Sequence, residues 1–349
     1  MSYFQKDYAT ARDHFLAAAE ARGFRQLRLR APAEESSELY VDFSMLKRNP
    51  KKLLLHISGL HGIEAYTGSA IQTKILKESL DAKLLAQGDH SILFIHGLNA
   101  FGMAFYRRTN ANNVDLNRNF LKDKTKINPD YEKFHPFLSP STPRAKYTSY
   151  FGFLFQLLGH GKERALQAIA SGQNTHPDGL FYAGTSLQRE ILHVVEFLRQ
   201  HFPLTEEAYV LDVHTGLGKR GKEFLFGDSD AASFATSCFQ RSLDFPAAKT
   251  ESYQSAGMFS EALRAALPKT NWHYFLQEFG TIGNFAVLRA LREENFAWKN
   301  RFKDPRALTK AGDKLYLAFN PSDPTWQEAS LALGLKRFMQ LNQSLAASV

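Results

Sequence analysis

The sequence predicts a single α/β domain over residues 1–349, with a mixed, mostly parallel central sheet and helices on both faces. Strand-like and helix-like segments alternate along the whole chain, which is the order that an α/β fold requires. No internal repeat, low-complexity tract or obvious linker divides the chain. Several strand-like runs are almost continuously apolar, as expected for strands that are covered on both faces.

Four strands and one helix are predicted in the first third of the chain. Residues 25–31 and 38–45 alternate between apolar and polar, which is typical of half-buried strands. Residues 52–57 and 91–96 are nearly continuous apolar runs, and we expect buried strands there. Between these two runs, a helix is predicted from about residue 65 to 85.

A long asparagine-rich stretch from residue 99 to 143 is predicted to be irregular, and helical sequence follows to about residue 171. Irregular stretches of this length inside a compact domain are usually functional. A helix from 186 to 202 carries its apolar residues at helical spacing. The next segment, 209–213, is predicted to be a buried strand.

The last third of the chain repeats the alternation of strand and helix. We predict a strand over residues 273–277 and helices over 283–298 and 325–345. In open α/β sheets, ligands bind beyond the carboxyl ends of the strands. Residues that follow the predicted strands are therefore the first candidates for a functional site.

The composition is that of a folded globular protein. Apolar residues make up 44% of the chain and charged residues 22%, which excludes a disordered or fibrous chain. The first residues contain no apolar run that could serve as the core of a signal peptide. The single cysteine, Cys238, excludes an internal disulfide framework. We therefore expect a cytoplasmic protein that does not span a membrane.

A formal charge of +8 would suit a nucleic-acid-binding protein, but the basic residues are scattered. One cluster, residues 47–52, contains an Asn-Pro pair between two predicted strands and is interpreted as a solvated turn. A net positive field can instead gather an anionic substrate. We expect no nucleic-acid or membrane partner, and the sequence gives no indication of oligomeric state.

His61, Glu64 and His214 are the candidate metal ligands. His61 and Glu64 lie three residues apart after one predicted strand, and His214 follows another. Zinc suits two imidazoles and a carboxylate, and a catalytic zinc site leaves a further position for water. The structural alternatives are an ordinary helix start for the first pair and a hydrogen-bonded core histidine for His214.

Glu278 follows the third of these strands and is the candidate general base. A carboxylate in that position is costly if it is buried without a purpose. As a base it would take a proton from a zinc-bound water and pass it to the leaving nitrogen. Its structural alternative is a glutamate in a salt bridge or a helix cap.

The asparagine-rich stretch offers groups that bind anions. Its arginines present planar forks of donors that suit a carboxylate or a developing oxyanion. Asp115 can accept a hydrogen bond from a metal-binding histidine and so fix its tautomer. The structural alternative is an ordered turn with solvated arginines.

The segments around these residues resemble the zinc carboxypeptidase family of metallopeptidases, a group related to succinylglutamate desuccinylase and aspartoacylase. The resemblance is strongest to its bacterial branch named as a domain of unknown function, DUF2817. It rests on four motifs that occur in the family's order: Gly-Leu-His61-Gly-Ile-Glu64, Asn-Val-Asp115-Leu-Asn117-Arg118-Asn-Phe, Leu-Asp-Val-His214-Thr-Gly and Gln-Glu278-Phe-Gly-Thr. Together they imply a zinc-carboxypeptidase-like fold.

Carried over by position, the resemblance implies one zinc ion on His61, Glu64 and His214, with Glu278 as the base. It also implies that Asn117 and Arg118 hold the substrate's terminal carboxylate and that Asp115 supports His61. A further arginine would polarise the scissile carbonyl. We assign this role to Arg108, with its neighbour Arg107 as the competing candidate, because spacing does not decide between them. Tyr253 is the best candidate for the tyrosine that covers the substrate.

These features support a zinc metallocarboxypeptidase that acts on short peptides with a free carboxylate. The same atoms would also serve a zinc-dependent deacylase that hydrolyses N-acyl amino acids or similar small amides. A non-enzymatic binding protein is suggested by the positive charge alone, and it requires none of the metal and acid-base residues.

Overall fold

The computed structural model describes most of the chain. The described residues are 2–32, 38–79, 89–120, 127–145, 147–149, 152, 169, 171–227, 229–246 and 257–347.

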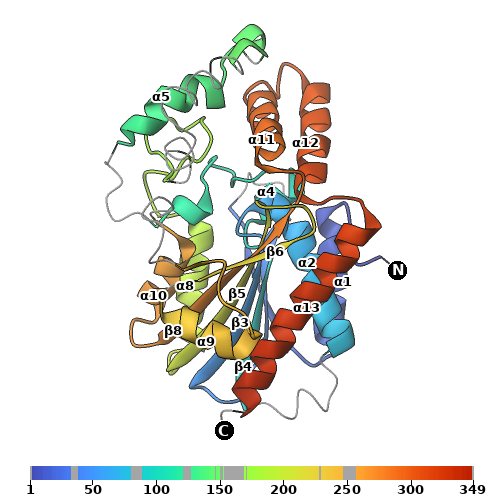
Figure 1. The fold of residues 1–349 in the computed structure, drawn as a ribbon, viewed down its shortest axis with the longest axis vertical. Coiled ribbons are helices and arrows are strands. Elements are labelled where there is room, and N and C mark those ends of the chain that lie inside the picture. The colour runs from blue at the N-terminus through green and yellow to red at the C-terminus, as the bar shows by residue number, and fades with distance from the viewer. Residues whose placement is uncertain are drawn as a thin grey trace.

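One eight-stranded mixed sheet forms the centre of the molecule (Figure 1), in the order β1-β2-β4-β3-β5-β8-β6-β7. Its strands are β1 (Arg25–Arg30), β2 (Tyr40–Leu46), β3 (Lys52–Ser58), β4 (Ser91–His96), β5 (Glu207–Gly216), β6 (Glu223–Gly227), β7 (Phe245–Pro246) and β8 (Asn271–Gly280). The four neighbouring strands β4, β3, β5 and β8 are parallel to one another. The carboxyl ends of these strands therefore meet at one edge of the sheet.

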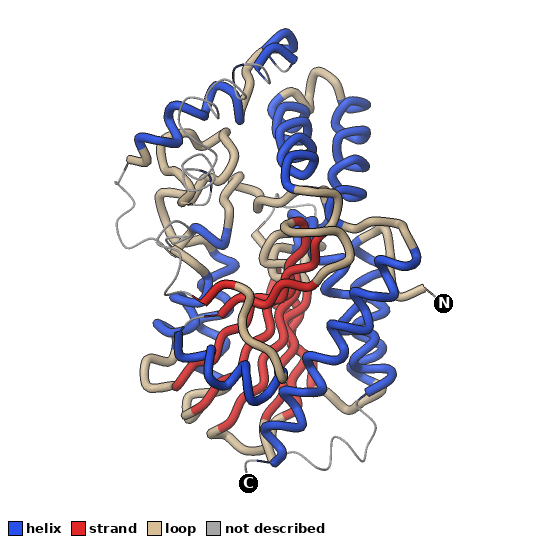
Figure 2. The backbone as a smooth tube through the Cα atoms, viewed as in Figure 1, coloured by secondary structure: helices blue, strands red, loops and turns tan. Residues whose placement is uncertain are grey.

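Helices cover both faces of the sheet (Figure 2). On one face lie α8 (Arg189–His201) and α10 (Phe259–Ala266), which pack with β2, β3 and β5 in one apolar core. On the other face lie α1 (Tyr8–Glu20), α2 (Ala65–Lys74), α9 (Ser229–Phe239) and α13 (Pro324–Ala347), which pack in a second core. The sheet is thus buried between two apolar layers, which explains its nearly continuous apolar strands.

A third group of elements lies beyond the carboxyl ends of the strands (Figure 1). It contains α4 (Ala100–Ala104), α5 (Pro129–Leu138), α11 (Asn284–Lys299) and α12 (Pro305–Phe319). Two short 3₁₀ turns lie nearby, η1 (Gly62–Glu64) and η3 (Leu116–Arg118), whereas η2 (Ile75–Ser79) is a short π-helix that continues α2. A separate apolar cluster joins α5, α11 and α12 to η1 and α2. This group surrounds the edge of the sheet where the candidate site residues lie.

The fold class predicted from the sequence is confirmed. All the predicted strands are present within a few residues of the expected bounds. The expectation of irregular structure from 99 to 143 is wrong in part, because α4 and α5 lie there. Asn128 caps α5 and Pro129 occupies its first turn, a local signal that predicts a helix start. The extent of one domain over residues 1–349 stays a prediction.

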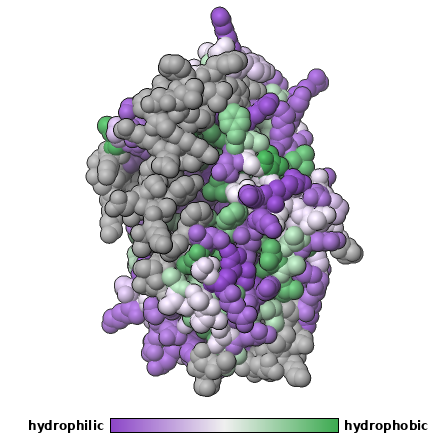
Figure 3. All heavy atoms as spheres, viewed as in Figure 1, coloured by the Kyte–Doolittle hydropathy of each residue, from purple (hydrophilic) through white to green (hydrophobic). Residues whose placement is uncertain are grey.

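The surface seen in Figure 3 mixes hydrophilic and hydrophobic side chains. Residues 47–52 form an exposed turn between β2 and β3, in agreement with the interpretation as a solvated turn. Within the described part of the chain, no helix is both long and apolar enough to cross a membrane.

Glycine is required at position 62, next to the candidate ligand His61. A Cβ atom at Gly62 would lie 2.2 Å from the carbonyl carbon of Gly102 and 2.3 Å from its Cα. Backbone atoms cannot move aside as the end of a flexible side chain can. The close approach of η1 to α4 therefore depends on the missing side chain.

Gly62→Ala is expected to reduce the free energy of unfolding by about 3 kcal/mol or more, because the added methyl group overlaps backbone. The measurement is urea denaturation of the variant and wild type. Gly221→Ala is the matched control: that residue has a φ of 71° but nothing within 4 Å of an added Cβ. The control should lose only about 1–2 kcal/mol. Equal losses in the two variants would contradict the proposed overlap.

Candidate metal centre and active site

Parallel pairing of three strands brings the candidate residues together. β5 lies between β3 and β8, and their register places His214 of β5 directly beside Glu278 of β8. β3 continues into η1, where the 3₁₀ turn carries Glu64 three residues after His61. Gly59 has a φ of 79° and allows the chain to turn sharply between β3 and η1. Three distant stretches thus meet at one edge of the sheet.

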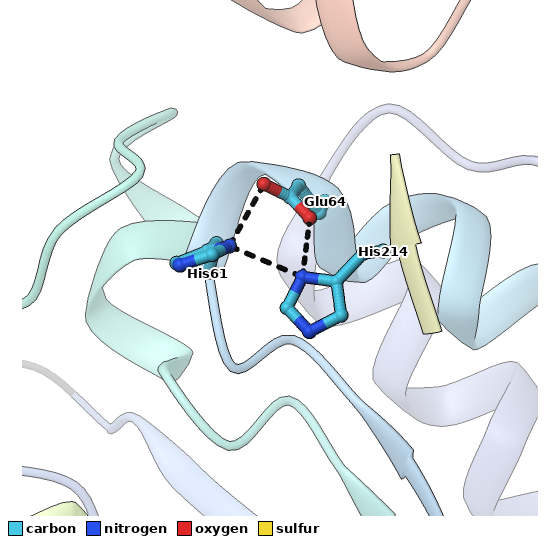
Figure 4. Close-up of side chains that lie close together, drawn as sticks. All are labelled: His61, Glu64 and His214. Atoms are coloured by element: carbon cyan, nitrogen blue, oxygen red, sulfur yellow. Dashed lines mark hydrogen bonds and ion pairs between the residues drawn. The ribbon is translucent and has the colours of Figure 1, made fainter. Parts of the chain in front are cut away.

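The side chains of His61, Glu64 and His214 converge on one point (Figure 4). Nδ1 of His61 lies 2.9 Å from Oε1 of Glu64, and Nδ1 of His214 lies 3.0 Å from Oε2. The two Nδ1 atoms are 3.2 Å apart. All three side chains are buried. Among the described residues, this is the group of His, Cys, Asp and Glu side chains whose donor atoms could share a metal ion.

These separations fit a metal ion of zinc's size. Two donor atoms that bind one zinc at about 2.1 Å in tetrahedral geometry lie about 3.4 Å apart. An Nδ1 pair at 3.2 Å also lacks a favourable hydrogen bond when both nitrogens present lone pairs. A cation between them removes that conflict, so the donor set suits a divalent ion.

The outer nitrogen of each imidazole faces an aspartate. Nε2 of His61 lies 3.1 Å from Oδ1 of Asp115 and 2.8 Å from Nη2 of Arg108. Nε2 of His214 lies 3.1 Å from Oδ2 of Asp212. A proton on Nε2 of His214 would leave its Nδ1 free to bind a metal. At His61, Asp115 favours a proton on Nε2, whereas Arg108 can only donate to that nitrogen. Asp212 was not singled out in the sequence, although alternation along a strand places it on the same face of β5 as His214.

The charges around the group act on one another strongly. Burial raises the pKa of Glu64, but the two histidines outweigh burial and hold this pKa well below its ordinary value. Burial lowers the pKa of His214, but the carboxylates of Asp212 and Glu64 outweigh it and raise this pKa well above its ordinary value. The carboxylates of Glu64 and Asp212 therefore favour a positive charge between or on the two imidazoles.

Glu278 is buried beside this group. Its Oε1 accepts a hydrogen bond of 2.8 Å from the backbone N–H of Leu217. Burial, and then the negative charge of Glu64, raise the pKa of Glu278 to about 8. A divalent cation nearby favours the ionised form of a carboxyl group. The side chain is thus a carboxyl group whose protonation depends on its neighbours, as acid-base catalysis requires.

The structure distinguishes Arg108 from Arg107. The guanidinium of Arg108 donates to Oε1 of Glu64 at 3.0 Å and to Oδ2 of Asp115 at 3.2 Å. Arg107 instead donates to Glu294 at 2.8 Å and stacks on Trp298, where it is fully buried. Arg108 therefore borders the candidate metal site, whereas Arg107 joins its loop to α11.

Asn117 and Arg118 lie in η3, close to Asp115. The side-chain oxygen of Asn117 accepts a hydrogen bond of 3.1 Å from the N–H of Phe259, which leaves its NH₂ group as a donor. Nη1 of Arg118 donates to the carbonyl of Asn117 at 2.7 Å. Both side chains are largely buried. Tyr253, the candidate for covering the substrate, lies outside the described residues.

Comparison with known proteins agrees with this architecture. The model of a family described as "Protein of unknown function (DUF2817)" matches residues 4–332. The crystal structure of thrombin activatable fibrinolysis inhibitor is similar with a TM-score of 0.53 at 13% identity, covering 99% of this chain and 76% of that one. Carboxypeptidase A from Helicoverpa armigera gives a TM-score of 0.50 at 15% identity, covering 92% and 75%. No curated protein matches this sequence. The expected carboxypeptidase-like fold is confirmed.

The geometry predicts that the purified protein binds about one equivalent of zinc and that His61→Ala and His214→Ala each abolish binding, because two ligands alone hold zinc weakly. Equilibrium dialysis followed by metal analysis gives the stoichiometry. His201→Ala, at the end of α8, is the control and should bind zinc as the wild type does. Undiminished zinc binding by His214→Ala would contradict the assignment.

Proposed function

The chain belongs to the DUF2817 family, and from its site we propose that it is a zinc-dependent metallocarboxypeptidase that hydrolyses a C-terminal peptide bond. The observation that supports this most is the convergence of the His61, Glu64 and His214 side chains, whose donor atoms lie within 4.8 Å of one another beside Glu278. The carboxypeptidase-like fold supports the same proposal.

Glu278 is the proposed general base. Bound between His61, Glu64 and His214, zinc would lower the pKa of a water ligand and polarise the substrate carbonyl. Glu278 takes the proton that leaves the attacking water as the new C–O bond forms. It then delivers this proton to the amide nitrogen as the C–N bond breaks. Its buried position keeps bulk water from exchanging that proton.

Arg108, Asn117 and Arg118 are proposed to orient the substrate. Arg108 already donates hydrogen bonds at the edge of the metal site, so it can stabilise the negative charge that develops on the carbonyl oxygen. Asn117 and Arg118 offer an amide and a guanidinium to the terminal carboxylate. The net charge of +8 assists the approach of such an anion. Tyr253 remains a proposed substrate-covering residue.

The proposed substrate is a short peptide with a free carboxylate, and the proposed location is the cytoplasm, which rests on the single cysteine. No nucleic-acid or membrane partner is proposed. Release of an acyl group from N-acyl amino acids, with no cleavage of di- or tripeptides, would instead identify the protein as a deacylase.

Glu278→Gln is expected to lower kcat by about 10²- to 10⁴-fold, because the amide cannot accept the proton. Zinc content should stay at the wild-type level, since Glu278 is not among the proposed ligands. The measurement is release of the C-terminal residue from a panel of di- and tripeptides by the zinc-loaded protein. Full activity of Glu278→Gln would remove this residue from the mechanism.

Arg118→Met is expected to reduce kcat/KM for peptides with a free C-terminus by about 10- to 100-fold, through loss of a charged hydrogen bond to the carboxylate. Cleavage of a C-terminally amidated peptide, if detectable, should change little. Arg189→Met, an exposed arginine at the start of α8, is the control. An equal loss for free and amidated peptides would show that Arg118 has a different role.

A further inference from the structure

Asp212 is a buried carboxylate that takes no part in the proposed reaction steps. Its side chain has no solvent exposure. The hydroxyl of Tyr274 donates a hydrogen bond to its Oδ2, and Nε2 of His214 lies 3.1 Å from the same oxygen. Its other oxygen, Oδ1, has no hydrogen-bond partner among the described residues. A carboxylate buried in this state is costly unless nearby positive charge compensates it.

We propose that Asp212, held by Tyr274, is a positioning residue that orients the imidazole of His214 so that its Nδ1 faces the metal site. The inference rests on the proposed zinc site. The contact between Nε2 of His214 and Oδ2 of Asp212 is an ion-pair contact, and Nε2 makes no hydrogen bond among the described residues. Because a carboxylate cannot donate a hydrogen bond, this close approach favours the imidazole form that carries its proton on Nε2. The proton then resides on Nε2, and Nδ1 presents its lone pair to the cation.

The strand register explains how the three residues meet. Alternation places Asp212 and His214 on one face of β5, and Tyr274 and Glu278 on one face of β8. In the parallel pairing, Asp212 lies opposite Leu276 and His214 lies opposite Glu278. Tyr274 is two residues before Leu276 and reaches Asp212 diagonally. A single pair of strands therefore carries a metal ligand, its orienting carboxylate and the proposed base.

Asp212 has a simpler set of contacts than Asp115, its counterpart at His61. Asp115 also accepts hydrogen bonds from Arg108 and from the N–H of Asn117. Replacing Asp115 would therefore disturb the substrate-binding residues as well as His61. Among the described residues, the side chain of Asp212 contacts His214 and Tyr274. A change at Asp212 thus tests the orientation of His214 with little effect on the rest of the site.

The alternative is that Asp212 serves only to join β5 to β8 through Tyr274. A purely structural role predicts a loss of stability in the metal-free protein, with no change in metal affinity once the protein is folded. A role in orienting His214 predicts instead that the folded variant binds the metal more weakly and that the ligand field of the bound metal changes. The two roles are therefore separated by measurements on the folded protein.

The test is Asp212→Asn, which keeps the size of the side chain but removes its charge and lets the amide donate to Nε2. Zinc affinity, measured by chelator competition, is expected to fall by about 10- to 100-fold. The visible spectrum of the cobalt-substituted protein should change as well. Urea unfolding of the metal-free proteins measures the structural contribution separately.

Two further variants complete the test. Tyr274→Phe keeps the carboxylate of Asp212 but removes the hydrogen bond that holds it, so zinc binding should weaken to a smaller extent than in Asp212→Asn. This variant also provides the test if Asp212→Asn does not fold. Asn342→Ala removes the hydrogen-bond partner of the buried His90 at the amino end of β4, and it should reduce stability without changing zinc affinity.

The outcomes separate the inference from the proposed function. If the wild type binds no zinc, the proposed metal site fails and the inference fails with it. If the wild type binds zinc while Asp212→Asn or, failing that, Tyr274→Phe binds it equally tightly with an unchanged cobalt spectrum, only the inference is overturned. Weaker zinc binding by a folded variant, with the zinc affinity of Asn342→Ala unchanged, supports it.

Discussion

Four carboxylates buried at one edge of the sheet impose the constraint on which the rest of the site depends. These are Glu64, Asp115, Asp212 and Glu278. Removing an ionised carboxylate from water costs several kcal/mol unless opposite charge and hydrogen bonds replace the solvent. Arg108 compensates Glu64 and Asp115 in part. A divalent cation between the two imidazoles would supply two further positive charges, so the ion proposed for catalysis would also stabilise the fold.

The sheet meets this constraint through register rather than through any local motif. β3, β5 and β8 run parallel, so their carboxyl ends deliver side chains from residues 61, 214 and 278 to one place. Backbone hydrogen bonds position the loop that carries the two arginines: the N–H groups of Gly62 and Ile63 donate to the carbonyls of Arg108 and Arg107. The arginine loop is therefore tied directly to the turn that carries the first two ligands.

The sequence predicted six of the eight described strands and singled out the candidate metal ligands, because both predictions rest on local signals: apolar runs and polar residues at strand ends. It could not choose between Arg107 and Arg108, because neighbouring residues differ only in what the fold places around them. The partner of Arg107 is Glu294, 187 residues away. Asp212 was overlooked although its spacing of two residues from His214 places both side chains on one face of β5. Its contact with Tyr274 of β8 is visible only in the fold. The strands β6 and β7 and the helices α1, α9, α10 and α12 were also missed. For α12 a start signal was present, since Asp304 caps the helix and Pro305 occupies its first turn.

The contacts of Arg107 show how the elements beyond the sheet serve the site. This guanidinium is fully buried between Glu294 and Trp298 of α11, and it also donates to Asn113. Loss of one partner in a buried ion pair typically costs about 3–5 kcal/mol. α11 therefore holds the loop at Arg107, and this contact also defines the position of Arg108, the next residue. Orientation of the proposed oxyanion-binding group thus depends on packing that touches neither substrate nor metal.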